Sequence, residues 1–98
     1  DVGAQFAYAT VSRLDGRYQD ALDAYGRMLK INPAERVVVS YNRARVLMYQ
    51  GRFDDALAEL DLGAQMEPNH PLVKTFRAVV MGRIRSALRS YALIGNVT

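Results

Sequence analysis

The chain has 98 residues, a formal net charge of +3 and no cysteine. This length allows one domain at most, and the lack of cysteine excludes disulfides and thiolate metal sites, which fits a reducing compartment such as the cytoplasm. No apolar run approaches the roughly 18 residues of a membrane span, so we expect no membrane insertion. The opening Asp1, in place of an initiator Met, indicates a fragment of a longer protein.

The first third of the chain predicts two helices joined by a turn. Apolar residues from Phe6 to Leu14 recur at helical spacing. The pair Asp15-Gly16 supplies a stop, because glycine tolerates the left-handed conformation that ends many helices. A second helix is predicted over residues 18–31, and Asn32-Pro33 ends it, since proline disfavours helix in the residue before it.

The second third repeats this plan in register. The stretch GRYQDAL at residues 16–22 returns as GRFDDAL at residues 51–57, a spacing of 35 residues. We therefore predict helices over about 34–50 and 54–66, closed by Glu67-Pro68, and a stack of such two-helix units. The matched positions expected to pack the repeats are Ala9, Gly16, Tyr18 and Ala21 in the first unit and Ala44, Gly51, Phe53 and Ala56 in the second.

These matched positions resemble a tetratricopeptide repeat array. The resemblance implies an all-α fold, an α-solenoid of helix-turn-helix repeats in a single domain over residues 1–98. Two full units would cover about 2–33 and 34–68, and a divergent or shortened third about 69–95. The chain departs from the family early in each first helix, where Trp and Leu are often found. Those positions hold Gln5 and Tyr8, then Ser40 and Arg43.

The third unit leaves two alternatives. GRIRSAL at residues 82–88 follows the second copy by only 31 residues. In the alternative that we favour, a short helix over about 71–81 turns at Gly82 into a second helix over about 86–94. In the other, residues 71–94 form one long helix, because a single apolar face continues without a phase break. That face consists of Val73, Phe76, Val80, Ile84, Ala87, Tyr91 and Ile94.

The basic residues are unevenly distributed along the chain. Residues 1–67 hold ten acids and eight bases, whereas residues 68–98 hold five bases and no acid. A basic tail can attract nucleic acid or an acidic partner. We favour the simpler interpretation, in which the tail faces acids on the preceding helix or on a segment outside this chain.

We predict no catalytic residue, metal or cofactor. His70 is the only histidine and stands in an inter-repeat loop without partners for a metal site or a general base. Acids near helix starts, such as Asp20 and Asp54, complement the helix dipole. The glycines stand one per turn and form no phosphate-binding cluster.

In the resembled family, the first helices line a concave groove that holds an extended peptide or a partner helix. Carried over residue by residue, the groove would comprise Phe6, Thr10 and Arg13, then Tyr41, Asn42, Arg45, Met48 and Tyr49, with Thr75, Phe76 and Val79 as candidates in the third unit. Arg13 and Arg45 place two cations on one face, which need an anion or solvent. Phe6, Tyr41 and Met48 fit packing between helices equally well, and that alternative stays open.

One ligand type can be argued against. In the chaperone-binding subset of the family, Lys, Asn and Arg side chains hold the terminal carboxylate of a peptide. Only Asn42 stands at a matching position here, while Phe6 and Thr10 occupy positions that would need polar groups. We therefore do not expect that ligand.

The sequence thus predicts a non-enzymatic protein–protein interaction module, which scaffolds a partner peptide or assembly through the concave face of stacked helices. The alternative is a structural or self-associating piece of a longer solenoid, a homodimer formed through the apolar C-terminal helix. Nucleic-acid binding ranks last, because the basic tail lacks interleaved aromatic residues.

Overall fold

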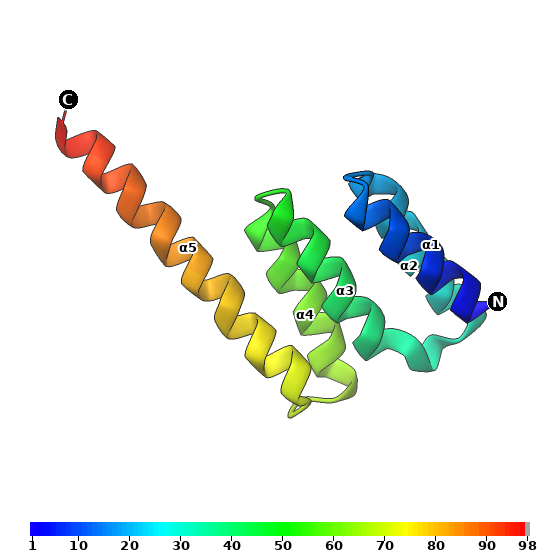
Figure 1. Cartoon of the computed structure of the whole chain (residues 1–98). Helices are drawn as coiled ribbons and strands as arrows, with labels where there is room; N and C mark the ends of the chain where they lie inside the picture. The colour runs from blue at the N-terminus through cyan, green and yellow to red at the C-terminus, as the bar shows by residue number, and fades with distance from the viewer. Residues whose placement is uncertain (98) are drawn as a thin grey trace.

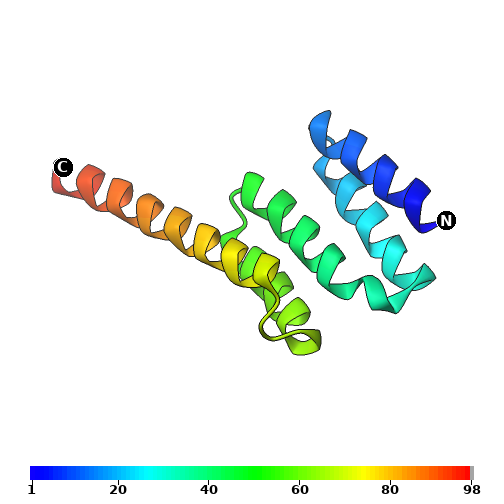
Figure 2. The same ribbon diagram turned by 60° about the horizontal axis from the view of Figure 1, so that its bottom comes forward.

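The computed structural model describes residues 1–97, which form helices and turns and no strand. The α-helices are α1 (Val2–Leu14), α2 (Tyr18–Ile31), α3 (Arg36–Tyr49), α4 (Phe53–Met66) and α5 (Pro71–Val97). Helices α1 and α2 form one pair and α3 and α4 a second, while α5 lies against the second pair and extends beyond it (Figures 1 and 2). The predicted all-α solenoid of helix-turn-helix repeats is confirmed.

The predicted helix bounds hold closely in the first two units. Helix α2 has the predicted bounds, and α4 begins one residue earlier than predicted, at Phe53. Helix α3 begins at Arg36, because Pro33–Glu35 forms a 3-10 turn, η1, in front of it. The Asn32 side chain stabilises this turn by accepting a hydrogen bond of 3.1 Å from the backbone N–H of Ala34.

Two glycines end the first helix of each pair. The φ angle is 78° at Gly16 and 74° at Gly51, in the left-handed region where a side chain is unfavourable. At the second turn, the N–H of Gly51 donates to the Met48 carbonyl at 2.9 Å and the N–H of Arg52 donates to the Leu47 carbonyl at 2.8 Å. Gly16 and Arg17 make the matching pair of bonds, so both turns are Schellman motifs.

Small side chains allow the helices to pack closely. The four alanines predicted to pack the repeats, Ala9, Ala21, Ala44 and Ala56, are fully buried. On α4, a Cβ added at Gly63 would lie 3.1 Å from the Ser40 Cβ and 3.4 Å from the Val73 Cγ2. Gly63 therefore lets α4 approach α3 and α5 at the same point.

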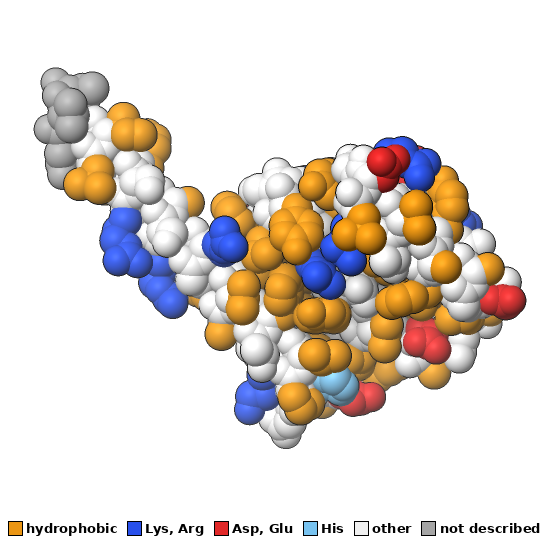
Figure 3. All heavy atoms as spheres, in the orientation of Figure 1, with side chains coloured by type: hydrophobic (Ala, Val, Ile, Leu, Met, Phe, Trp, Pro, Cys, Tyr) orange, Lys and Arg blue, Asp and Glu red, His pale blue; other side chains and the backbone are white. Residues whose placement is uncertain are grey.

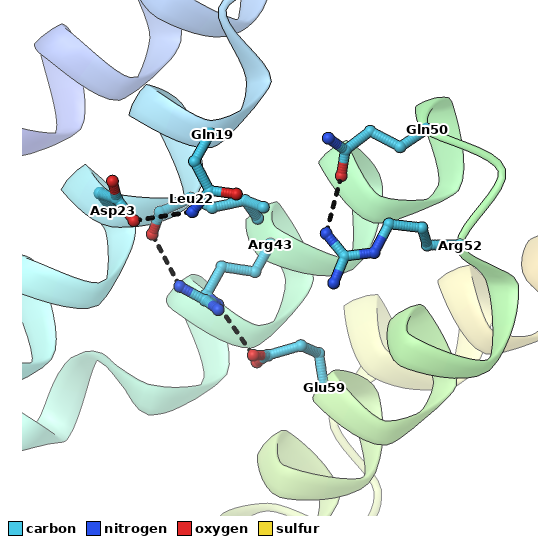
Figure 4. Close-up of polar contacts among 7 residues, drawn as sticks. All are labelled: Gln19, Leu22, Asp23, Arg43, Gln50, Arg52 and Glu59. Atoms are coloured by element: carbon cyan, nitrogen blue, oxygen red, sulfur yellow. Dashed lines mark hydrogen bonds and ion pairs between the residues drawn. The ribbon is translucent and has the colours of Figure 1, made fainter.

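Arg43 links the two pairs of helices. Its Nε donates to Glu59 Oε1 on α4 at 2.8 Å, and its Nη1 donates to the Leu22 carbonyl on α2 at 2.7 Å (Figure 4). A Cβ added at Gly26 would lie 3.4 Å from that Nη1, so glycine leaves room for the guanidinium. The departure from the family pattern at Arg43 thus has a structural reason, because one side chain joins three helices.

The C-terminal segment is one helix of 27 residues, so the favoured helix-turn-helix over 71–94 is wrong. Gly82 does not adopt the positive φ of Gly16 and Gly51. The apolar face continues through it: Val73 and Val80 are buried, and Phe76 and Ile84 pack against the core. A turn at Gly82 would separate Ile84 from this face. After Ile84, every residue as far as Gly95 is exposed.

Alanine substitutions at two glycines test this difference. Gly51→Ala should lower the free energy of unfolding by about 1–2 kcal/mol, because alanine is strained in the left-handed conformation. Gly82→Ala should raise it by about 0.5–1 kcal/mol, because a helical glycine is replaced and a Cβ there meets only Arg85 Nη2, at 3.9 Å. Urea unfolding of both variants measures the changes, and a destabilised Gly82→Ala protein would contradict the continuous helix.

Candidate functional site

The fold confines the acids of the α-helices to one of two layers, although α2 in that layer also carries Arg27 and Lys30. Helices α1, α3 and α5 lie on the viewer's side in Figure 1, with α2 and α4 behind them. No Asp or Glu occurs in Val2–Leu14, Arg36–Tyr49 or Pro71–Val97, which together carry Arg13, Arg36, Arg43, Arg45, Lys74, Arg77, Arg83, Arg85 and Arg89. Helices α2 and α4 carry Asp20, Asp23, Asp54, Asp55, Glu59 and Asp61. We call the exposed side of α1, α3 and α5 the α1–α3–α5 face.

The predicted residues Arg45 and Tyr49 are in contact on this face. Arg45 Nε donates to the Tyr49 hydroxyl oxygen at 3.4 Å, one helical turn later on α3. This hydrogen bond lowers the pKa of Tyr49 below its ordinary value, and the positive charges of Arg13 and Arg83 lower it further. The same bond raises the pKa of Arg45. Cations from α1, α3 and α5 therefore act on one phenol.

Aromatic side chains join the helices beneath and beside these cations. The Phe6 ring meets Tyr25 of α2 edge to face, with centroids 6.2 Å apart. Tyr41 meets Phe76 of α5 in the same manner at 5.2 Å. Phe6 is nevertheless exposed and Tyr41 half-buried. The two alternatives for these residues, packing between helices and exposure on the face, therefore coexist.

Several predicted groove residues contribute little open surface. Asn42 is only 7% exposed, and its Nδ2 donates to the Val38 carbonyl at 2.8 Å. The Thr10 hydroxyl donates to the Phe6 carbonyl at 2.9 Å within α1. Met48 is half-buried against the core. The structure thus brings together Arg13, Arg45 and Tyr49 but leaves Asn42 with little surface for a ligand.

Arg83 of α5 belongs with these cations and was missed by the sequence analysis. The candidates predicted in the third unit are Thr75, Phe76 and Val79, of which Thr75 and Val79 are exposed and Phe76 is half-buried. The turn predicted at Gly82 would remove Arg83 from the face. The signal was the repeat spacing itself, since Arg83 lies two periods of 35 residues after Arg13.

Among the described residues, the arginines fall into two groups, those paired with a carboxylate and those without one, and the cations around Tyr49 belong to the second group together with Arg27, Arg36, Arg85 and Arg89. Arg17, Arg43, Arg52 and Arg77 form ion pairs with carboxylates. Over residues 1–97, no ion pair engages Arg13, Arg45 or Arg83, and Arg13 Nε is buried without a hydrogen-bond partner. In Figure 3, basic side chains lie among hydrophobic ones in the middle of the face, and the visible acidic side chains lie nearer its edges.

His70 has a local structural contact. Its Nδ1 accepts a hydrogen bond of 3.2 Å from the Leu72 N–H, and its Nε2 lies 3.9 Å from Glu67 Oε2. Within the described part of the chain, no three residues of the types His, Cys, Asp and Glu group as metal ligands would. None of the helices described combines the length and the hydropathy that crossing a membrane requires.

Comparison with known proteins identifies one family. The family model described as Tetratricopeptide repeat matches residues 13–80, which is more than half of the chain. The matched range contains α2, α3, α4 and the first part of α5. A search of the curated proteins and a search of the solved structures each returned no significant match.

The contact between Arg45 and Tyr49 predicts an unusual tyrosine titration. Tyr49 should ionise below the ordinary pKa of a tyrosine, and Arg45→Gln should move its pKa back toward that ordinary value. Because the pKa is lowered on folding, the ionised pair stabilises the fold above the ordinary tyrosine pKa. This stabilisation disappears as the pH falls through the lowered value.

Ultraviolet phenolate absorbance measures this titration, and Tyr49→Phe identifies the component that belongs to Tyr49. Arg89→Gln is the control, because it removes an exposed arginine of α5 that does not act on Tyr49. A component unchanged by Arg45→Gln would contradict the assignment.

Proposed function

The chain belongs to the tetratricopeptide repeat family, and on that premise we propose that it binds a partner peptide or assembly through the α1–α3–α5 face. Repeats of this family are generally protein–protein interaction modules. The face is formed by the same first helices that the sequence analysis expects to line a groove. The observation that carries the proposal is the contact of half-buried Arg45 with exposed Tyr49, beside half-buried Arg13; within residues 1–97 neither arginine forms an ion pair.

The chemistry of this face supports recognition of a protein. Tyr49 is 49% exposed, and its hydroxyl is oriented by Arg45. Tyrosine and arginine are enriched among the residues that dominate binding energy, because they combine large contact area with directional donors. Val38 and Val79 add exposed apolar area on α3 and α5. Such a surface offers anchors for both apolar and polar groups of a partner.

Selection of peptides from a displayed library against the full chain tests this proposal. The variant Tyr49→Ala should weaken binding of the selected peptides by about tenfold or more, as for a central anchor residue. The control is Leu62→Ala, which truncates an exposed side chain of α4 beside Gln19 and Arg43, outside the proposed face. Peptides that depend on Leu62 and ignore Tyr49 would contradict the proposal.

A second candidate function, self-association through α5, is favoured by one specific observation. The apolar face of α5 is buried as far as Ile84 and then continues into exposed residues. Tyr91 is 78% exposed and Leu88 63% exposed, with Leu93 and Ile94 exposed as well. Apolar side chains gathered on one projecting helix are typical of a contact with another chain.

Light scattering across a concentration series tests self-association. We expect a dimer that dissociates on dilution if α5 mediates it, and Ile94→Asp should shift the dimer toward the monomer. Ser90→Asp introduces the same charge at an exposed position of α5 outside the apolar face and should leave the mass unchanged. A monomer at all concentrations would contradict this candidate.

A further inference from the structure

The ligand of the α1–α3–α5 face can be specified further from its charges. Every acid on an α-helix belongs to α2 or α4, where several already pair with arginines. Arg13, Arg45 and Arg83 come from three different helices and have no carboxylate partner in residues 1–97. Like-charged side chains around one phenol repel one another. A negatively charged ligand on this face would lower that electrostatic energy.

Buried polar atoms at the same place lack partners too. Arg13 Nε is buried and makes no hydrogen bond with the described residues. The hydroxyl of Tyr25, a fully buried residue, is likewise without a partner, and Tyr25 acts electrostatically on Arg45. Buried donors are nearly always satisfied in folded proteins, so an unpartnered one calls for an explanation. Both atoms lie beneath the surface, where a docked ligand would not reach them, so they show only that polar groups under this face are left uncompensated by the described residues.

Resting on the proposed function, we propose that the partner is an acidic peptide segment whose side-chain carboxylates bind Arg13, Arg45 and Arg83, with apolar side chains between them. Each guanidinium offers several donors in a planar arrangement that matches a carboxylate. The apolar side chains of the peptide would contact Val79 and the exposed edges of Phe6 and Phe76. The partner thus carries negative charge, opposite to that of the face, and also apolar side chains that contact the apolar residues of the face.

The distribution of the cations favours side-chain carboxylates over a terminal one. A single terminal carboxylate could satisfy only one part of a set that spans α1, α3 and α5. Asn42, the residue at the position matching a terminal-carboxylate site, is buried and bonded to Val38 within α3. Several carboxylates along an extended segment therefore fit the surface better.

The aromatic residues favour a peptide over a nucleic acid. Single-stranded nucleic acids bind through a series of aromatic faces on which successive bases stack. Here the rings of Phe6 and Phe76 each pack against another ring, Tyr25 and Tyr41 respectively. Their free edges suit aliphatic contacts better than base stacking.

Fluorescence anisotropy tests the proposal with peptides of defined charge. The probe is an acetylated and amidated peptide of repeating Glu-Leu-Ser, which has no terminal carboxylate. The comparison peptide has the same sequence with Gln in place of Glu. At about 0.1 M salt, where long-range attraction is largely screened, the Glu peptide should bind and the Gln peptide should not. Arg45→Gln and Arg83→Gln should each weaken binding about tenfold.

The control is Arg89→Gln, which removes the same charge from an exposed position of α5 away from Tyr49 and should leave binding unchanged. Circular dichroism establishes that each variant is folded, and Arg83, being exposed, can be replaced without loss of packing. Equal weakening by Arg89→Gln and Arg45→Gln would overturn the proposal, because it would indicate diffuse attraction. Equal binding of the Gln peptide would overturn it as well.

Two further outcomes separate the alternatives. A Gln-Leu-Ser peptide with a free C-terminal carboxylate that binds better than the capped Glu peptide would overturn the side-chain assignment. An oligothymidylate that displaces the Glu peptide, with binding that falls steeply as salt rises, would favour a nucleic acid instead. If the peptides selected from the library are neutral but their binding depends on Tyr49, the proposal of an acidic ligand is wrong and the proposed function stands. If their binding does not depend on Tyr49, the proposed function itself is wrong.

Discussion

The left-handed conformation of Gly16 and Gly51 is the constraint on which the rest of the structure depends. Each glycine reverses the chain within a few residues, so that the second helix of a unit packs antiparallel to the first. Because the two turns are alike, α1 and α3 take equivalent places in successive units. The first helices therefore share one layer and the second helices the other, and any difference in composition between them becomes a difference between two surfaces.

Charge is the property in which the two layers differ most. The carboxylates of α2 and α4 have local roles, as Glu59 shows by pairing with Arg43 between the units. All charged residues of the first helices are bases. Three of these bases lie around Tyr49 and form no ion pair in residues 1–97. Arg43 and Arg45 are separated by one residue of α3 but differ completely in role. Arg43 holds the units together, whereas Arg45 donates a hydrogen bond to Tyr49 of its own helix and forms no ion pair in residues 1–97.

The sequence predicted the repeats well because their determinants are local. Glycine, proline and the alternation of small and large apolar residues gave the α2 bounds and the two turns. The third unit was predicted incorrectly, because Gly82 looks like Gly16 in sequence but is overridden by the packing of Val80 and Ile84 on either side. The burial of Asn42 and the contribution of Arg83 could not be predicted, since both depend on how α3 and α5 are rotated against their neighbours.

The central claim is that the partner contacts the α1–α3–α5 face. It does not contact the layer of α2 and α4 or the projecting end of α5. Nuclear magnetic resonance mapping on the full chain tests it most directly, with the capped Glu-Leu-Ser peptide titrated into labelled protein. We predict that the largest shifts occur at the guanidinium Nε–H groups of Arg13, Arg45 and Arg83 and at the backbone around Tyr49. Shifts confined to α2 and α4, or to the exposed part of α5 after Ile84, would contradict the account.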